Sequence, residues 1–245
     1  MKKKSVKRIL SGVMVLAVSI ALCACGGDKN ADKDAANNSQ ETAEDTTEEK
    51  SEDSAAGEPT QGGSVVVGMT QDLVSLDPHA VTDAGTRNVV FNLYEGLVKA
   101  TPAGELAPAV ASDYTISDDA KVYTFTLRDG VTFHDGSAVT VDDIKYSIER
   151  YAEEQGDSSA FSIVDEVVTP DDKTVEVHLK EANSEFISEL TLGIIPASNE
   201  DPAGTPVGTG PFKFVSYTPG QNIVLERYDG YWGTPAYLDQ VTFKF

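Results

Sequence analysis

His134 and Asp135 stand side by side in the stretch "YTFTLRDGVTFHDG", residues 123–136. A histidine next to a carboxylate can act as a general base, but catalysis also needs a nucleophile or a third group in a pocket. The sequence contains no nucleophile elbow, no His-Glu-x-x-His motif and no usable cysteine. The Asp-Gly steps at Gly130 and Gly136 favour tight turns. We therefore interpret His134 as a structural hydrogen-bonding residue, assign no catalytic residue and expect a protein that is not an enzyme.

Metal and phosphate chemistry find little support in the sequence. His79, His134 and His178 lie far apart along the chain, so no local metal-ligand spacing exists, although a site assembled from scattered residues stays open. Gly208-Thr209-Gly210 resembles a phosphate-binding loop, but such a loop must run into a helix N-terminus. Here Pro211 leads into an alternating strand pattern, which predicts an ordinary turn. We expect no cofactor and no metal ion.

The N-terminus carries a secretory leader that ends in two cysteines. Basic residues at the start precede an apolar run over residues 9–22, which is shorter than the ~20 residues of a spanning helix. Leu22-Cys23-Ala24-Cys25 looks like a bacterial lipobox, with Cys25 as the cysteine that receives a lipid; Cys23 is the poorer candidate because Leu22 would precede it. Two acyl chains hold a domain at a bilayer. We predict a lipoprotein signal peptide over residues 1–25, with an ordinary cleavage site as the alternative.

The charge distribution limits the possible partners. Residues 28–60 contain 11 acidic and 3 basic residues and no aromatic residue, so we predict that residues 26–62 form a disordered acidic linker. Residues 61–245 contain 29 acidic and 11 basic residues, and the whole chain has a net charge of −21. This balance argues against nucleic acid as a partner and against adsorption to an anionic membrane.

The remaining sequence alternates strand and helix patterns. The β-branched run 64–68 predicts a buried strand, and apolar spacing predicts a helix over 86–98. Residues 121–127 predict a strand with its aromatic face toward a core, and Thr140 with Asp143 predicts a capped helix start. The other predictions are strands at 174–180, 212–217, 223–228 and 241–245, and a short helix at 185–195.

Three ordered motifs are typical of one family. They are "SLDPHAVTDAGTRNVVFNLYEGLV", "YTFTLRDGVTFHDGSAVTVDDIKYSIER" and "PVGTGPFKFVSYTPGQNIVLERYDGYWG". Together they resemble the extracellular solute-binding proteins of family 5, which serve peptide, oligopeptide and nickel ABC importers. The resemblance implies an α/β fold: a periplasmic-binding-protein-like lobe one with an inserted α+β subdomain. It places lobe one at 63–90 and 191–245 and the inserted subdomain at 91–190, so 63–245 is a partial solute-binding domain, truncated before lobe two.

The resemblance also implies where a ligand would bind. In peptide-binding relatives the loop after the first strand makes main-chain contacts with an extended peptide. The matching residues are Ala80, Val81, Thr82, Asp83 and Ala84. Phe161 lies near the position of an aromatic residue that contacts the ligand in some relatives.

The function implied by the resemblance is the capture of peptides outside the cell for delivery to an ABC permease and its ATPase. We expect a monomer, lipid-anchored on the extracytoplasmic face of a Gram-positive-type cell membrane. Two alternatives stay open: binding of nickel or another small solute within the same family, and a truncated surface lipoprotein without transport activity.

Overall fold

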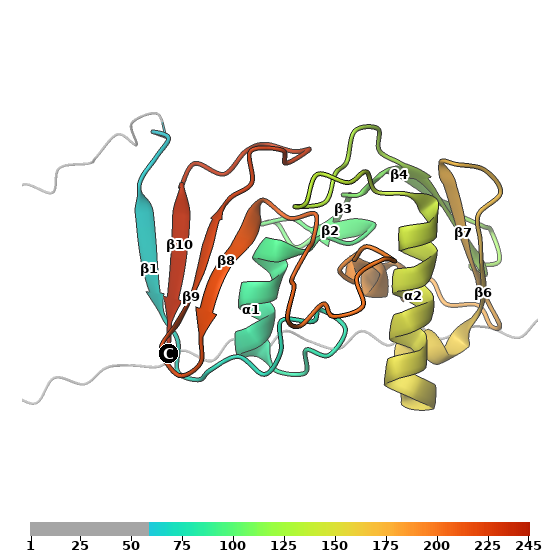
Figure 1. The fold of residues 1–245 in the computed structure, drawn as a ribbon. Helices are drawn as coiled ribbons and strands as arrows, with labels where there is room; N and C mark the ends of the chain where they lie inside the picture. Colours follow the sequence, from blue (N-terminus) through green and yellow to red (C-terminus); the bar gives the residue numbers. More distant parts are fainter. Residues whose placement is uncertain (1–58) are drawn as a thin grey trace, which may run out of the picture. The chain divides into compact units, whose positions relative to one another are not determined.

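The computed structural model describes residues 59–245. The predicted signal peptide, Cys25 and nearly all of the predicted linker lie outside the described residues. Two sheets, a small two-stranded hairpin and two α-helices make up the described chain (Figure 1). No helix within residues 59–245 has the length and apolar character needed to cross a membrane.

The first sheet has four strands in the order β1-β10-β9-β8. These are β1 (Ser64–Gly68), β8 (Phe212–Thr218), β9 (Asn222–Arg227) and β10 (Gln240–Lys244). β1 runs parallel to β10, and the other pairs are antiparallel. The predicted strands are confirmed, but the prediction that 64–68 is buried is wrong. Within residues 59–245, β1 pairs with β10 alone, and Val66 remains 59% exposed.

α1 (Ala84–Leu93) packs against this sheet (Figure 1). Asp83 caps the helix because its side chain accepts a hydrogen bond from the Thr86 amide. Leu93 packs in one core with Ile223 and Leu225 of β9. The helix predicted over 86–98 ends earlier than expected, because the backbone becomes extended at Tyr94 and the chain continues to β2.

The second sheet has the order β4-β5-β7-β6 and is antiparallel throughout. Its strands are β4 (Ala111–Ile116), β5 (Val122–Leu127), β6 (Val164–Val168) and β7 (Thr174–Leu179); the separate hairpin joins β2 (Val98–Ala100) and β3 (Leu106–Pro108). Tyr123 and Phe125 are fully buried, which confirms the inward aromatic face predicted for this strand. The sequence patterns did not reveal β2, β3, β4 or β6.

α2 (Val141–Gln155) covers the second sheet near β6 and β7. The predicted capping box is present: the Thr140 hydroxyl accepts from the Asp143 amide, and the Asp143 carboxylate accepts from the Thr140 amide at 2.9 Å. Ile144 and Ile148 are buried in the same core as Tyr123 and Phe125. Each sheet thus has its own helix and its own hydrophobic core. The predicted boundaries of lobe one and the inserted subdomain stay a prediction.

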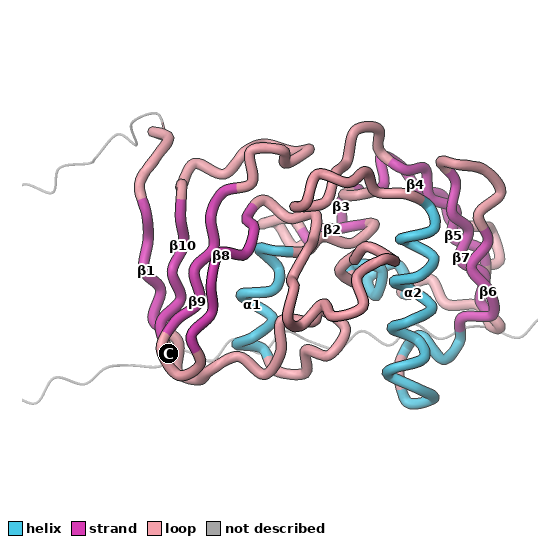
Figure 2. Tube along the Cα trace, in the orientation of Figure 1, coloured by secondary structure: helices cyan, strands magenta, loops and turns pink. Residues whose placement is uncertain are grey.

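Short 3-10 helices and loops complete the chain. They are η1 (Gly156–Ser158), η2 (Ala160–Ile163) and η3 (Phe186–Thr191). The helix predicted over 185–195 is therefore only a 3-10 turn. Residues 192–211, between η3 and β8, form no helix or strand (Figure 2). The 192–211 loop is nevertheless bound to α2, because the Ile195 amide donates a hydrogen bond to the buried Ser147 hydroxyl at 3.0 Å.

The Gly208-Thr209-Gly210 turn leads into β8, as predicted, and lies against the C-terminal end of α1. The Gly210 amide donates to the Leu93 carbonyl at 2.9 Å. A Cβ atom on Gly208 would lie 2.1 Å from that carbonyl oxygen, and one on Gly210 would lie 2.5 Å from the Asn92 oxygen. These two positions require glycine because the backbones approach closely, so the motif allows the turn to pack against the end of α1.

Substitution of Gly208 tests this packing constraint. Gly208→Ala should lower the free energy of unfolding by about 2 kcal/mol, because neither backbone segment can move aside freely. Gly68→Ala in β1 is the matched control, since no atom lies within 4 Å of its added Cβ. Urea denaturation measures both variants. Equal stability of the two variants would contradict the close approach.

Candidate ligand-binding site

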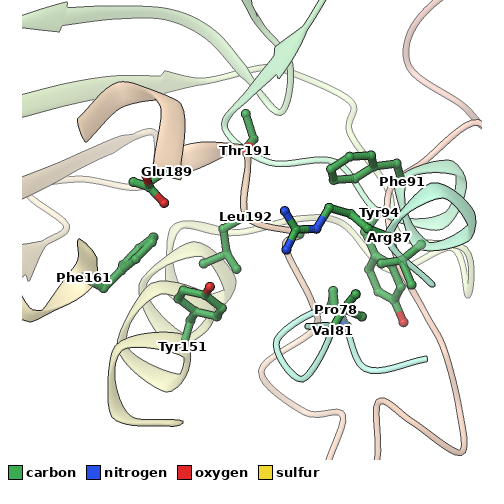
Figure 3. Close-up of a pocket in the computed structure, with 12 residues that line it drawn as sticks. Pro78, Val81, Arg87, Phe91, Tyr94, Tyr151, Phe161, Glu189, Thr191 and Leu192 are labelled. Carbon is green, nitrogen blue, oxygen red and sulfur yellow. The ribbon is translucent and has the colours of Figure 1, made fainter. Parts of the chain in front are cut away.

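A cavity of about 130 Å³ opens where the two halves of the described chain meet. Its walls come from the loop after β1, from α1, from the end of α2, from η2 and from the segment around η3 (Figure 3). The lining residues are Pro78, Val81, Arg87, Val90, Phe91, Tyr94, Tyr151, Phe161, Glu189, Thr191, Leu192 and Gly193. Most of these residues are aromatic or aliphatic, with one cationic and one anionic group, but the surface that faces the cavity is more polar than apolar.

An ion pair fixes the loop that forms one wall. Arg150 of α2 binds both carboxylate oxygens of Asp77, at 2.6 and 3.2 Å. Asp77 is 7% exposed, so its charge depends on this bidentate partner. The same guanidinium donates to Nδ1 of His79 at 2.6 Å, and Gln155 donates to the His79 carbonyl. The end of α2 thus holds residues 77–79 in place, just before Val81.

His79 connects this ion pair to the cavity wall. Its Nε2 donates to the Gly193 carbonyl at 3.0 Å, because Nδ1 already accepts from Arg150. Burial lowers the pKa of His79 to about 4, and the Arg150 charge lowers it further, so the ring is neutral near pH 7. The His79 ring packs edge-on against Tyr151, and Tyr151 packs edge-on against Phe161 with centroids 4.8 Å apart.

Arg87 and Glu189 are the charged groups of the lining. In Figure 3 the Arg87 guanidinium extends from α1 toward Leu192, and Glu189 lies on the other side of the cavity near Phe161. Burial raises the pKa of the Tyr151 hydroxyl between them; Glu189 raises it further and Arg87 lowers it. Arg87 and Glu189 therefore both influence the pKa of the Tyr151 hydroxyl, in opposite directions.

A second cavity of about 320 Å³ adjoins the first. The two share Phe91, Tyr94 and Thr191 in their linings. Glu95 lies in the second cavity and is nine-tenths buried, and its carboxylate accepts from Lys99 at 2.9 Å and from the Tyr231 hydroxyl at 2.6 Å. Phe91, which is 57% exposed, lines both hollows.

Only some of the predicted ligand-binding residues line the cavity. Val81 and Phe161 line the same cavity, although 80 positions separate them. Ala80, Thr82, Asp83 and Ala84 do not belong to its lining; Asp83 instead caps α1, and hydrogen bonds from Thr86 lower the pKa of its carboxyl. Phe161 is 2% exposed, so it contributes a packed wall. Ligand contact by any of these residues stays a prediction.

Sequence reasoning missed Arg87, Phe91, Tyr151 and Glu189. One signal was present for Phe91: it is a large aromatic residue off the apolar face of α1, where the buried positions are Val89, Val90 and Leu93. Arg87 and Glu189 gave no such signal, because isolated charges on helical segments are usually solvated.

His134 has the structural role that was predicted. Its Nδ1 accepts from the Gly208 amide at 3.2 Å and its Nε2 donates to the Gly210 carbonyl at 3.1 Å, so it joins the β5–α2 connection to the glycine turn. Burial lowers the pKa of His134 to about 4. Within residues 59–245, no group of three His, Cys, Asp or Glu side chains is arranged to hold a metal ion.

The described chain has a mixed sheet, an antiparallel sheet and a cavity between them, and its solved structural neighbours are periplasmic binding proteins. The family model for bacterial extracellular solute-binding proteins, family 5 (Middle), matches residues 105–245. The chain belongs to this family.

Relatives of known name agree with this assignment. The glutathione-binding protein GsiB of Pectobacterium atrosepticum is 31% identical over 73% of this chain and 37% of its own length. The oligopeptide-binding protein AppA of Bacillus subtilis is 29% identical over 99% of this chain and 44% of its own length. The structure of DppA from Helicobacter pylori in complex with the peptide STSA superposes with a TM-score of 0.69 at 30% identity, covering 76% of this chain and 43% of DppA. The chain thus spans less than half the length of these relatives.

The lowered pKa values of His79 and His134 predict a loss of stability in acid. The unfolded chain binds a proton on each histidine as pH falls below 6.5, whereas the folded pKa values are about 4. The free energy of unfolding therefore rises with pH between about 4 and 6.5, by up to about 3 kcal/mol per histidine.

Urea denaturation from about pH 7 to about pH 4.5 measures this slope. His134→Asn should make the slope shallower, because one of the two neutral histidines is removed. His178→Asn is the control, since His178 bonds Glu176 on the partly exposed second sheet. A slope in His134→Asn equal to that of the wild type would contradict the assignment.

Proposed function

We propose that this chain is the substrate-binding lipoprotein of an ABC importer, which captures peptides outside the cell and delivers them to a membrane permease. Membership of the extracellular solute-binding family supports this role. The names of the relatives support peptide as the ligand class, since they are a glutathione-binding protein, an oligopeptide-binding protein and a protein with a bound peptide.

One observation carries the proposal more than any other. Val81 and Phe161 come from distant segments and line one cavity, and the family resemblance predicts ligand contacts for both. The adjoining cavity beyond Phe91 adds a second hollow. Two hollows in succession suit an extended chain whose side chains enter separate pockets. A peptide fits this arrangement better than a compact ion.

Capture would occur by equilibrium binding without a covalent step. The peptide backbone would lie beside residues 80–84, and its side chains would pack on Phe91, Leu192 and Tyr151. The loop is already held by Arg150, so little ordering entropy is lost on binding. The loaded protein, as a monomer, would then present the peptide to the permease and its ATPase.

The lipid anchor belongs to the same proposal. Diacylation of Cys25 would hold the protein at the outer face of the cell membrane, and the acidic segment 26–62 would act as a tether. The net charge of −18 over residues 61–245 would keep the binding domain away from the anionic lipid surface.

Peptide binding by the full chain tests the proposed function. A mixture of short peptides at millimolar concentration should shift amide resonances of the ¹⁵N-labelled protein around Val81, Phe91 and Thr191. Phe91→Ala should weaken the binding about fivefold, because an exposed aromatic contact is lost without damage to the core. Tyr237→Ala is the matched control, as Tyr237 is 48% exposed and absent from the cavity lining. Shifts confined to other surfaces would refute the site.

Lipidation is testable independently of the ligand. Cys25→Ser should abolish incorporation of labelled palmitate and release the protein from the membrane fraction, whereas Cys23→Ser should retain both properties. Metabolic labelling and cell fractionation measure the outcome. Undiminished labelling of the Cys25→Ser protein would rule out Cys25 as the lipidated residue.

A further inference from the structure

Residues 192–197, which follow η3, form a junction segment between the two hydrophobic cores. Ile194 is buried in the core of the second sheet, whereas its neighbour Ile195 is buried in the core of the first sheet. Leu192 and Gly193 line the cavity, and Figure 3 shows Leu192 on its wall. The same short segment therefore connects the two cores and forms part of the cavity wall.

Backbone hydrogen bonds attach the start of the junction segment to two neighbouring elements. The Gly193 carbonyl accepts from Nε2 of His79 at 3.0 Å. The Ile194 amide donates at 3.0 Å to the carbonyl of Glu95, which lies just after α1. This wall of the cavity is thus bonded to the loop after β1 and to the end of α1.

Ser147 of α2 binds the middle of the junction segment. Its side chain is fully buried, and its hydroxyl accepts from the Ile195 amide at 3.0 Å. The hydroxyl donates to the Asp143 carbonyl at 2.7 Å, the shorter of its two acceptor contacts. The Ala197 amide donates to the Asp143 carboxylate at 2.8 Å. Arg150, which holds the loop after β1, lies three residues beyond Ser147 and hence on the same side of the helix.

We propose that Ser147 is a positioning residue of the ligand site, which holds the wall at Leu192 and Gly193 in place through the Ile195 amide. This inference rests on the proposed binding function. Ser147 does not belong to the cavity lining, so it acts through the junction segment. Because α2 bonds the junction segment through Ser147 and the opposite loop through Arg150, one helix sets the spacing of two walls. Without the hydroxyl, the buried Ile195 amide loses its acceptor, which favours displacement of the segment.

Binding of the dipeptide Ala-Phe to the ¹⁵N-labelled full chain measures this role. Ser147→Ala should weaken the binding about threefold, because the wall no longer stays in its binding position. Val241→Ala is the control for a loss of stability alone, since Val241 is buried in the core of the first sheet and absent from the cavity lining. It should lower the free energy of unfolding and leave the dissociation constant unchanged.

Amide hydrogen exchange of the ligand-free chain tests the position of the wall directly. In Ser147→Ala, exchange should become about tenfold faster at Leu192 and Ile194 as well as at Ile195, because the junction segment opens as one unit. In Val241→Ala, these three amides should keep the same rates relative to the rest of the core.

The possible results separate this inference from the proposed function. Faster exchange confined to Ile195 would overturn the positioning role, and so would an equal affinity for Ala-Phe in Ser147→Ala and the wild type; peptide binding stands in both cases. An equal loss of affinity in Ser147→Ala and Val241→Ala would also overturn it. If Ala-Phe does not bind the wild type at millimolar concentration, the proposed function and the role of Ser147 in binding are both contradicted.

Discussion

The ion pair between Asp77 and Arg150 is the interaction on which the candidate site depends. It joins the loop after β1, next to the first core, to α2 of the second core. Asp77 is buried, so loss of Arg150 would leave an unpaired charge at a cost of about 3 kcal/mol or more. Through His79 the same pair reaches Tyr151 and then Phe161. One guanidinium thus supports two walls of the cavity.

The second interaction that fixes the arrangement of the chain is the close backbone packing of the glycine turn on α1. The glycine turn at 208–210 contacts the end of α1, and His134 bonds both glycines of this turn. His79 and His134 use the same arrangement: a neutral ring accepts at Nδ1 and donates to a backbone carbonyl at Nε2. Each therefore links segments that are distant in sequence without introducing a buried charge. His79 thus helps to position the cavity wall at Gly193, alongside the walls that α1, α2, η2 and η3 provide.

The sequence predicted features that are encoded locally. Alternation identified the buried face of β5, and a three-residue spacing identified the Thr140 capping box. Properties that depend on distant packing were not predictable from these patterns. The valines of β1 have the composition of a buried strand, yet they are exposed in the described sheet, in which β1 is an edge strand. Arg87 and Glu189 acquire a shared environment only after α1 and η3 are brought together. Of the residues that the family resemblance named, Val81 and Phe161 line the cavity, but their ligand contacts stay a prediction, and the resemblance could not show which neighbouring residues complete the lining.

The central claim is that a peptide occupies the cavity between the loop after β1 and the η3 segment. The most direct test measures intermolecular nuclear Overhauser effects between unlabelled Ala-Phe and the ¹³C-labelled full chain. The account predicts contacts from one bound peptide to Val81 on the loop and to Leu192 beyond η3. Contacts restricted to another surface, such as the exposed valines of β1, would contradict it.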